Sequence, residues 1–184
     1  MRVIAGSAKG TKLNSIDDSS TRPTLDRVKE PLFSIIQNYI DDSNVLDLFA
    51  GSGALGIETL SRGAKHCTFC DSSYKSIQML KENISKTRME EKSTIINMDY
   101  KKCLDNLNEK FNIIFIDPPY KKNIATDSIK RIVNLKLLAE DAIIILETDE
   151  EERELENLKD VEELEVYDNR KYGRVKLLFL HERG

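Results

Sequence analysis

The stretch Asn44-Val45-Leu46-Asp47-Leu48-Phe49-Ala50-Gly51-Ser52-Gly53-Ala54-Leu55-Gly56 decides the fold of this chain. It begins as an apolar strand, passes through a glycine turn and continues into a helix. Glycines at 51 and 53 allow backbone conformations that other residues avoid, and they leave space for a ligand. The helix that follows presents free N–H groups and the positive end of its dipole. The pattern therefore predicts a nucleotide-type binding turn at the carboxyl end of a strand, where open α/β sheets bind their ligands.

The spacing Gly51-x-Gly53-x-x-Gly56 also fits a dinucleotide fingerprint. Asp47, four residues before Gly51, changes this interpretation. A carboxylate there would repel a pyrophosphate, but it can accept hydrogen bonds from a cationic or hydroxylated ligand. The stretch from Asp47 to Gly53 resembles motif I of S-adenosylmethionine-dependent methyltransferases, in which the acid faces the methionine part of the ligand. The candidate cofactor-binding residues in this turn are Asp47, Phe49, Gly51, Ser52, Gly53 and Gly56.

Length and composition indicate one globular domain over residues 1–184. The chain is 40% hydrophobic and 33% charged, and no apolar run reaches the roughly 18–20 residues of a membrane span. The N-terminus lacks the apolar region of a signal peptide, so we expect a cytoplasmic protein with no membrane association. Three cysteines include the pair Cys67-x-x-Cys70, but no second pair could complete a metal site. We expect reduced thiols and no metal.

Charge is unevenly distributed along the chain. The net charge is −4, yet residues 140–165 alone hold thirteen Asp and Glu against two Lys and Arg. The remaining residues therefore carry a net charge of +7. An acidic stretch of this kind is usually a solvated surface, and another face of the molecule can still be basic enough to contact phosphates.

From Asn44 onward, apolar strands alternate with amphipathic helices. Strands are predicted at 44–49, 66–71, 93–97, 112–117 and 142–147, and helices at about 53–62, 74–87, 100–107, 124–136 and 150–158. Such alternation implies a parallel sheet with helices on both faces. Two final strands, at about 161–168 and 174–180, are separated by too few residues for a crossover and should pair antiparallel. We therefore predict an α/β, Rossmann-like fold with a mixed seven-stranded sheet and one antiparallel strand.

Residues 1–42 form an extension that precedes this core of residues 43–184. A small hairpin is expected at 2–14, followed by a polar loop and a helix with Thr24 as its N-cap. Pro31 lies inside the helical pattern and removes one backbone hydrogen bond. The first acid is Asp17, and six basic residues lie within the first 29 positions: Arg2, Lys9, Lys12, Arg22, Arg27 and Lys29.

Acids follow the second and third strands of the core. Asp71 ends the second strand and can accept hydrogen bonds from both hydroxyls of a ribose, in NAD or in S-adenosylmethionine. A second acid often stands two residues later in methyltransferases, where this chain has Ser73. Asp99 follows the third strand at the position where similar enzymes bind the adenine amino group, and it could equally cap the next helix. Asp71 and Asp99 complete the candidate cofactor site.

The fourth strand runs into Asp117-Pro118-Pro119-Tyr120. Two prolines fix the backbone and remove two N–H donors, so carbonyl oxygens and the Asp117 carboxylate project beside the glycine turn. This tetrapeptide resembles motif IV of amino-group methyltransferases, which binds an exocyclic –NH₂ of a base or a glutamine amide. An aryl amine is a poor nucleophile, and acceptors at Asp117 and Pro118 would orient its lone pair for attack while Tyr120 stacks on the base. The candidate catalytic residues are Asp117, Pro118, Pro119 and Tyr120.

Motifs along nearly the whole chain resemble the bacterial 16S ribosomal RNA guanine-966 N2-methyltransferase family. They include Arg2-Val-Ile-Ala-Gly6, Arg22-Pro-Thr-Leu-Asp-Arg27 and Tyr172-Gly173, besides motifs I and IV. The resemblance implies S-adenosylmethionine as cofactor, and a guanine amino group of 16S rRNA in the small subunit or its assembly intermediate as acceptor. It also implies RNA contacts by the extension, for which the candidates are Arg2, Lys9, Lys12, Arg22 and Arg27. We expect a monomer.

Two alternatives stay open at this point. The first is another amino methyltransferase that acts on DNA adenine N6 or on protein glutamine, although the basic N-terminus favours a nucleic acid. The second is a nucleotide-binding module or NAD oxidoreductase that uses the same glycine turn. Asp47 and the Asp117-Pro-Pro-Tyr120 sequence argue against the second.

Overall fold

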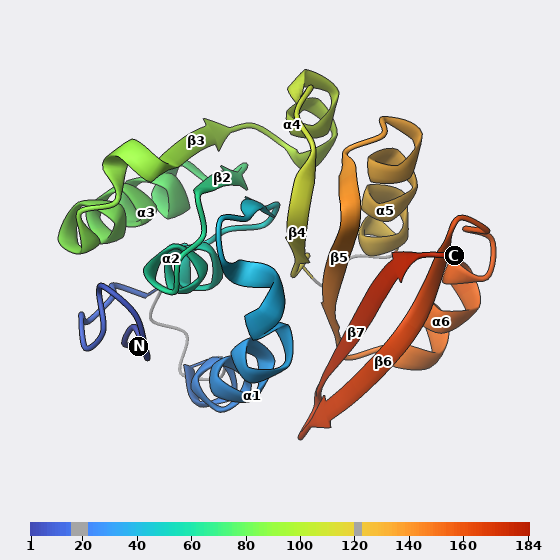
Figure 1. Cartoon of the computed structure of the whole chain (residues 1–184), viewed down its shortest axis with the longest axis horizontal. Coiled ribbons are helices and arrows are strands. Elements are labelled where there is room, and N and C mark those ends of the chain that lie inside the picture. The colour runs from blue at the N-terminus through green and yellow to red at the C-terminus, as the bar shows by residue number, and fades with distance from the viewer. Residues whose placement is uncertain (16–21, 120–122) are drawn as a thin grey trace.

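A computed structural model describes residues 1–15, 22–119 and 123–184. It contains a seven-stranded sheet of order β3-β2-β1-β4-β5-β7-β6 with flanking helices (Figure 1). The strands are β1 (Asn44–Asp47), β2 (His66–Asp71), β3 (Ser93–Asn97), β4 (Phe111–Ile116), β5 (Leu138–Thr148), β6 (Leu164–Tyr172) and β7 (Val175–Glu182). The helices are α1 (Arg22–Ile40), α2 (Ala54–Ser61), α3 (Tyr74–Thr87), α4 (Tyr100–Asn106), α5 (Ile124–Asn134) and α6 (Glu151–Leu158), with a 3-10 turn, η1 (Glu90–Lys92). Among the described residues, no helix is long and apolar enough to cross a membrane.

The strand order confirms the predicted mixed sheet. β1 lies at the centre and pairs in parallel with β2 on one side and β4 on the other, so the order of the strands reverses between β1 and β4. β7 pairs antiparallel with both β5 and β6 and is the reversed strand of the described sheet. The reversal point between β1 and β4 is where an open α/β sheet leaves a crevice for a ligand.

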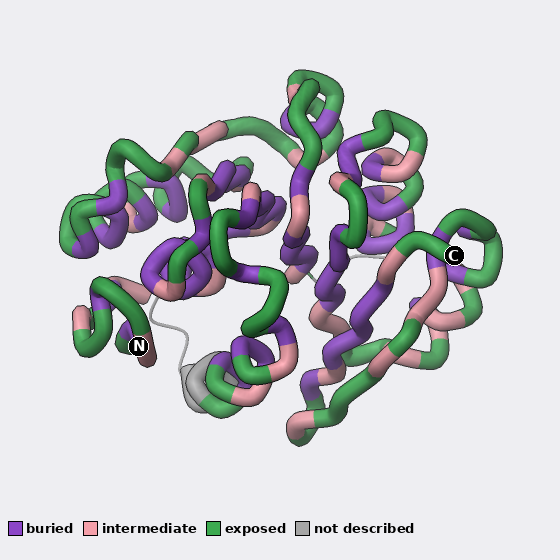
Figure 2. The backbone as a smooth tube through the Cα atoms, in the orientation of Figure 1, coloured by how far each residue is buried: buried purple, intermediate pink, exposed green. Residues whose placement is uncertain are grey.

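Each face of the sheet has its own apolar core. Helices flank the sheet (Figure 1), and buried residues lie along both the strands and the helices (Figure 2). Buried side chains of α1, α2 and α3 pack on one face, where Val45, Phe115 and Ile145 point. Those of α4, α5 and α6 pack on the other face, where Leu46, Ile114 and Leu146 point. Successive strand residues thus alternate between the two cores, as the pleat requires. We call the first the α1–α3 face and the second the α4–α6 face.

The N-terminal extension differs in two details from its prediction. The helix already begins at Arg22, so Thr24 lies within the first turn and is not the N-cap. The hairpin is reduced to a single bridged pair, Arg2 with Lys12, because the N–H groups of Ile4 and Ala5 donate to a side chain of α2 and not to a second strand. The helix continues through Pro31 to Ile40.

The cysteines are buried, free thiols. Cys67 and Cys70 lie on opposite faces of β2, since Cys67 belongs to the core under α1–α3 and Cys70 to the core under α4–α6. Burial raises the pKa of the Cys67 thiol well above its ordinary value. These side chains act as small apolar groups of the core.

Candidate functional site

The glycine turn connects β1 to α2 and is shaped by its neighbours. Gly51 and Gly53 both have positive φ, at 55° and 81°. A Cβ at Gly53 would lie 2.2 Å from a methyl group of Leu80, and one at Gly56 would lie 2.3 Å from the ring of Phe69. A Cβ at Gly51 would meet nothing within 4 Å. Packing therefore requires glycine at 53 and 56, whereas a Cβ at Gly51 would point into open space.

Asp47 ends β1 on the α1–α3 face and is almost completely buried. One carboxylate oxygen accepts the N–H of Gly56, at 3.2 Å. Burial raises the pKa of Asp47 to about 7; the Gly56 N–H opposes this shift, and the charges of Asp117 and Asp71 add to it. A buried carboxylate with one weak donor favours a nearby cation, which would bring its pKa down again.

Asp71 ends β2 beside the same turn. Its two carboxylate oxygens accept backbone N–H groups, one from Gly51 at 2.8 Å and one from Ser73 at 2.8 Å. Asp71 therefore holds the glycine turn against the end of β2. Each oxygen retains a lone pair, so a ribose diol can still bind there.

Asp99 caps helix α4, which is one of the two roles considered from the sequence. One of its oxygens accepts the N–H groups of Lys101 and Lys102, at 2.9 and 3.2 Å. Its other oxygen has no partner among the described residues and remains open to a donor. Beside it, the ring of Tyr100 packs on Phe49 with centroids 5.6 Å apart, so Phe49 is held at the margin of the turn.

Asn83 was not recognised from the sequence, yet it joins two parts of the site. This fully buried residue of α3 donates to the carbonyl oxygen of Ser52 in the glycine turn, at 2.8 Å. It also exchanges two hydrogen bonds with the backbone of Asn14, at 2.7 and 2.9 Å. One amide side chain thus connects the N-terminal extension to the turn. An isolated Asn in an amphipathic helix gives no sequence signal of such a contact.

The Asp117-Pro-Pro segment follows β4 at the edge where β1 and β2 also end. Asp117 and Pro118 are partly buried, and Pro119 is exposed. Burial raises the pKa of Asp117 to about 7. Tyr120, the fourth residue of the predicted catalytic set, lies outside the described residues. Asp47, Asp71 and Asp117 thus gather at one edge of the sheet, close enough for the charges of the other two to act on Asp47.

The basic candidates of the extension lie on its surface. Arg2, Lys9, Lys12 and Arg27 are exposed, and within the described parts of the chain none of them pairs with an acid. The backbone of Arg22 begins α1, but its side chain lies outside what the structure describes. Lys29 is different, because it is 1% exposed and pairs with Glu58. It is therefore a core residue, contrary to its interpretation as another surface base.

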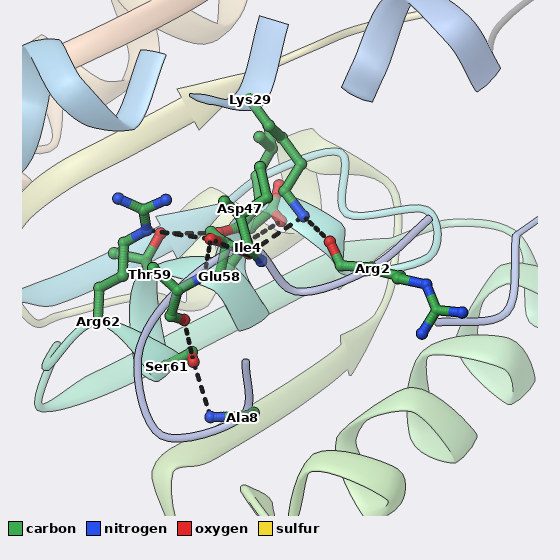
Figure 3. Close-up of polar contacts among 12 residues, drawn as sticks. Arg2, Ile4, Ala8, Lys29, Asp47, Glu58, Thr59, Ser61 and Arg62 are labelled. Carbon is green, nitrogen blue, oxygen red and sulfur yellow. Dashed lines mark hydrogen bonds and ion pairs between the residues drawn. The ribbon is translucent and has the colours of Figure 1, made fainter. Parts of the chain in front are cut away.

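Glu58 of α2 fixes the extension to the core (Figure 3). Its buried carboxylate lies 3.1 Å from Lys29 Nζ and 3.0 Å from Arg62 Nε, and it accepts the N–H groups of Ile4 and Ala5. Lys29 Nζ also donates to the carbonyl oxygen of Arg2, at 3.0 Å. The helix that begins at the glycine turn thus also anchors the N-terminal residues.

The residues present fit S-adenosylmethionine. Asp47 offers a buried carboxylate for a cationic group, Asp71 offers acceptors for a ribose, and Gly51 borders open space beside them. When bound, this cofactor supplies a methyl group carried on a positively charged sulfur. The Asp117-Pro-Pro edge lies beside the turn and can hold an acceptor amine.

Comparison with known proteins agrees with this geometry. Residues 1–181 match the model of a family described as conserved hypothetical protein 95. The chain is 38% identical to ribosomal RNA small subunit methyltransferase D of Haemophilus influenzae, covering 82% of this chain and 80% of the relative. It is 35% identical to the Escherichia coli K12 protein of the same name, over 82% and 76% of the two chains. A solved Escherichia coli structure, that of YhhF, superposes with a TM-score of 0.84 at 26% identity, covering 100% of this chain and 98% of that chain.

Fold, site and relatives together define a methyltransferase of the S-adenosylmethionine-dependent class, with a Rossmann-like fold. This class replaces the alternative of an NAD oxidoreductase or a simple nucleotide-binding module. Within the class, the chain belongs to the family described as conserved hypothetical protein 95, with small-subunit methyltransferases D among its relatives.

Replacing Asp71 with alanine is expected to weaken S-adenosylmethionine binding by about 1.5–3 kcal/mol, the usual contribution of hydrogen bonds to a charged group. Part of this loss would arise because the Gly51 N–H loses its acceptor, Asp71, and the glycine turn is then less firmly held. Asp71→Asn keeps one acceptor oxygen and should show an intermediate loss. Isothermal titration calorimetry measures both affinities, and unchanged binding by the alanine variant would remove Asp71 from the site.

Proposed function

We propose that this enzyme methylates the N2 amino group of a guanine in 16S rRNA, presented by the small ribosomal subunit or its assembly intermediate. The observation that carries the proposal is the placement of Asp117-Pro118-Pro119 beside the glycine turn at the edge where β1, β2 and β4 end. The relatives named small-subunit rRNA methyltransferases support an rRNA substrate. We propose that the enzyme acts as a monomer in the cytoplasm, where a ribosomal substrate would be available.

The proposed role of the motif is to hold the amine. The Asp117 carboxylate would accept a hydrogen bond from one N2–H of guanine, and the Pro118 carbonyl oxygen would accept one from the other. These two contacts would turn the nitrogen lone pair toward the methyl group. The bound cofactor would supply the methyl group for the new N–C bond and would retain the electrons of its C–S bond on sulfur. The nitrogen then loses a proton to Asp117 or to water. A carboxylate with a pKa of about 7 is a better proton acceptor than an ordinary one.

The basic residues of the extension provide the proposed RNA surface. They are joined by Arg170, Lys171 and Arg174 at the turn of the β6–β7 hairpin. In the sheet, Lys176 of β7 pairs with Thr148, the last residue of β5, so the hairpin turn projects beyond the carboxyl end of β5. It therefore reaches past the edge that holds Asp117. The hairpin and the extension are proposed to contact RNA phosphates around the target base.

Helix α6, which lies within the acidic stretch, is distant from the N-terminal extension (Figure 1). It supplies many of the acids of that stretch and packs with Leu158 on the α4–α6 face, whereas the extension and α1 cover the α1–α3 face (Figure 1). The acids of α6 thus lie on the other side of the sheet from the basic residues of the extension. This separation reconciles a net charge of −4 with a nucleic-acid substrate.

Replacing both Lys9 and Lys12 with glutamine should lower RNA affinity and flatten its salt dependence. For every phosphate that the variant no longer binds, the slope of log K against log salt concentration should fall by roughly 0.7–0.9. A matched control replaces Lys65 and Lys110, two exposed lysines next to the amino ends of β2 and β4. Filter binding over a range of salt concentrations measures the slopes. An unaltered slope in the first variant would place the RNA surface elsewhere.

The substrate itself is tested by following a labelled methyl group. Small-subunit particles from cells that lack the enzyme, naked 16S RNA, DNA and bulk protein are each incubated with labelled S-adenosylmethionine. Nucleoside digestion and mass spectrometry then locate the label. We expect N2-methylguanosine from the particle, with naked RNA a poorer substrate, because a target base must be displayed unstacked. Label in N6-methyladenine of DNA or in protein glutamine would refute the proposal.

A further inference from the structure

Glu147, next to the last residue of β5, lies beside Asp117. Strands β4 and β5 are parallel, and Ile116 pairs with Leu146 at the end of their shared register. Asp117 and Glu147 are the next residues of the two strands. Neighbouring strands are about 4.8 Å apart, so the backbones place the two acids side by side at the candidate catalytic edge.

Both side chains belong to the same face of the sheet. Phe115 and Ile145, two residues earlier in each strand, belong to the core under α1–α3. Glu147 also pairs with Leu177 of the neighbouring strand β7, and Leu177 is part of that same core. Because side chains alternate along a strand and paired residues share a face, Asp117 and Glu147 both continue the α1–α3 face. Asp47, two residues after Val45 of that core, shares this face.

The two acids lack donors in the part of the chain that the structure describes. Within those residues, neither Asp117 nor Glu147 accepts a hydrogen bond or forms an ion pair. The nearest basic residue of β7, Lys176, pairs instead with Glu151 at 3.0 Å. Burial raises the pKa of Glu147 to about 8, with a further contribution from the charge of Asp117. Two such acceptors, partly withdrawn from water and side by side, suit a ligand that carries two adjacent donors.

Guanine carries such donors. Its N1–H and N2–H groups are neighbours on one edge of the base, whereas adenine presents an N6–H donor beside an N1 acceptor. When both carboxylates are ionised they complement guanine and leave an adenine N1 without a donor, and the N–H groups of guanine themselves favour the ionised form.

We propose that Glu147 is a specificity-determining residue that accepts the guanine N1–H while Asp117 and Pro118 hold the N2 amine. This inference rests on the proposed function and adds a base-recognition contact to it. A site that binds a substrate N–H with a buried acceptor rejects analogues that lack the N–H, because the acceptor is then left unpaired.

The test compares guanine with 2-aminopurine at the target position. This base retains the 2-amino group but has an unprotonated N1, and its fluorescence rises when it leaves the base stack. RNA carrying either base is assembled into small-subunit particles, and kcat/KM and the fluorescence change on binding are measured. The enzymes are the wild type, Glu147→Gln and the control Glu140→Gln, an exposed acid at the other end of the same strand.

We expect the wild type and the control to prefer guanine by about 10- to 100-fold, the range for a hydrogen bond to a charged group. In Glu147→Gln, kcat/KM for guanine should fall by at least about tenfold. This variant should use 2-aminopurine at least as well as the wild type does, since an amide N–H can donate to its N1. The fluorescence rise with 2-aminopurine should be at least as large with this variant. The guanine preference should therefore largely disappear.

Three results would overturn the inference. A wild-type enzyme that uses both bases equally well would show that N1–H is not recognised. If Glu147→Gln lowered kcat/KM equally for both bases, with unchanged fluorescence on binding, Glu147 would only support the fold. Methyl transfer by the wild type to an acceptor other than guanine would refute the proposed function, and the inference with it. The first two results leave N2-methylguanosine as the product and so spare the proposed function.

Discussion

Replacing Asp117 with alanine is expected to reduce turnover by at least about 100-fold while the affinity for S-adenosylmethionine stays near that of the wild type. The proposed contacts of Asp117 are to the acceptor amine, and they matter most in the transition state, where the nitrogen becomes positive. Asp117→Asn should retain part of the activity, because the amide oxygen still accepts one N–H. Single-turnover rates and calorimetric affinities separate the two effects.

A matched control for this prediction is Asp105→Ala, which removes an exposed acid of α4, with a side chain 57% exposed. It should leave turnover and cofactor affinity unchanged. Full activity in Asp117→Ala would refute the role assigned to this carboxylate. A loss of cofactor affinity that equals the loss of turnover would instead place Asp117 in the cofactor site.

The pH dependence provides a second measurement on Asp117. Its pKa is about 7 in the folded protein against an ordinary value of 3.8, because burial disfavours the charged form. The carboxylate must be ionised to accept N–H groups, so turnover should rise with pH through about 7. Asp117→Asn cannot titrate at this position, and its residual turnover should depend less on pH.

Folding stability should show the opposite trend. A carboxyl group whose pKa is raised on folding contributes stability that is fully present below its unfolded-state pKa and is lost as pH rises through its folded-state pKa. For Asp117 this window runs from about 4 to about 7. The stability of Asp117→Asn relative to the wild type should therefore increase across this window, as denaturant unfolding at several pH values would show. The same residue is thus expected to favour catalysis and disfavour folding at neutral pH.

Replacing Glu58 with alanine is expected to destabilise the protein by about 3–5 kcal/mol, since it leaves a buried cation without its partner. Lys29 is 1% exposed, and its ammonium lies 3.1 Å from the Glu58 carboxylate. The N–H groups of Ile4 and Ala5 would lose their acceptor at the same time. Urea unfolding followed by circular dichroism measures the change in the free energy of unfolding.

The control is Glu156→Ala, which breaks a pair with Lys159 in which the side chains are 72% and 70% exposed. An exposed pair of this kind contributes at most about 1 kcal/mol. If Glu58→Ala also lost only about 1 kcal/mol or less, the buried network would not be what stabilises the fold. A double variant, Lys29→Met with Glu58→Gln, removes both charges and should be less destabilised than the sum of the single changes.

Glu58 also connects stability to the proposed function. It anchors residues 4 and 5 of the segment that carries Arg2, Lys9 and Lys12, so a weakened network would release the proposed RNA surface before it disturbs the glycine turn. The turn has its own support in Asp71 and Asn83. We therefore expect RNA affinity to suffer more than cofactor affinity in Glu58→Ala.

Much of the fold could be predicted from the sequence, because each element has a local signature. The glycines at 51 and 53, the alternation of apolar strands with amphipathic helices and the short link between the last two strands predicted the mixed sheet that the structure contains. Strand ends differ from the prediction by up to four residues: β5 begins at Leu138 and not at 142, and β6 ends at Tyr172 and not at 168. The prediction of Thr24 as N-cap was wrong, because the helix already begins at Arg22, two residues before Thr24.

The sequence alone determined where acids follow strands, and parallel strands bring such acids to one edge. Asp47, Asp71, Asp99 and Asp117 could therefore be named as site candidates, and their roles in binding and catalysis stay predictions. The sequence could not show which basic residues are free, since the burial of Lys29 depends on an acid 29 residues away in another helix. Nor could it show that Asn83 links Ser52 to Asn14.

Only the tertiary structure decided where Glu147 lies relative to Asp117. In the sequence it is one acid among the thirteen of residues 140–165, and nothing local separates it from its neighbours. The register of β4 with β5 places it beside Asp117, and the pairing of β5 with β7 assigns it to the α1–α3 face. Both properties arise from contacts between strands that are distant in the chain. Local sequence determines which residues can form a strand, but strand pairing determines which side chains meet.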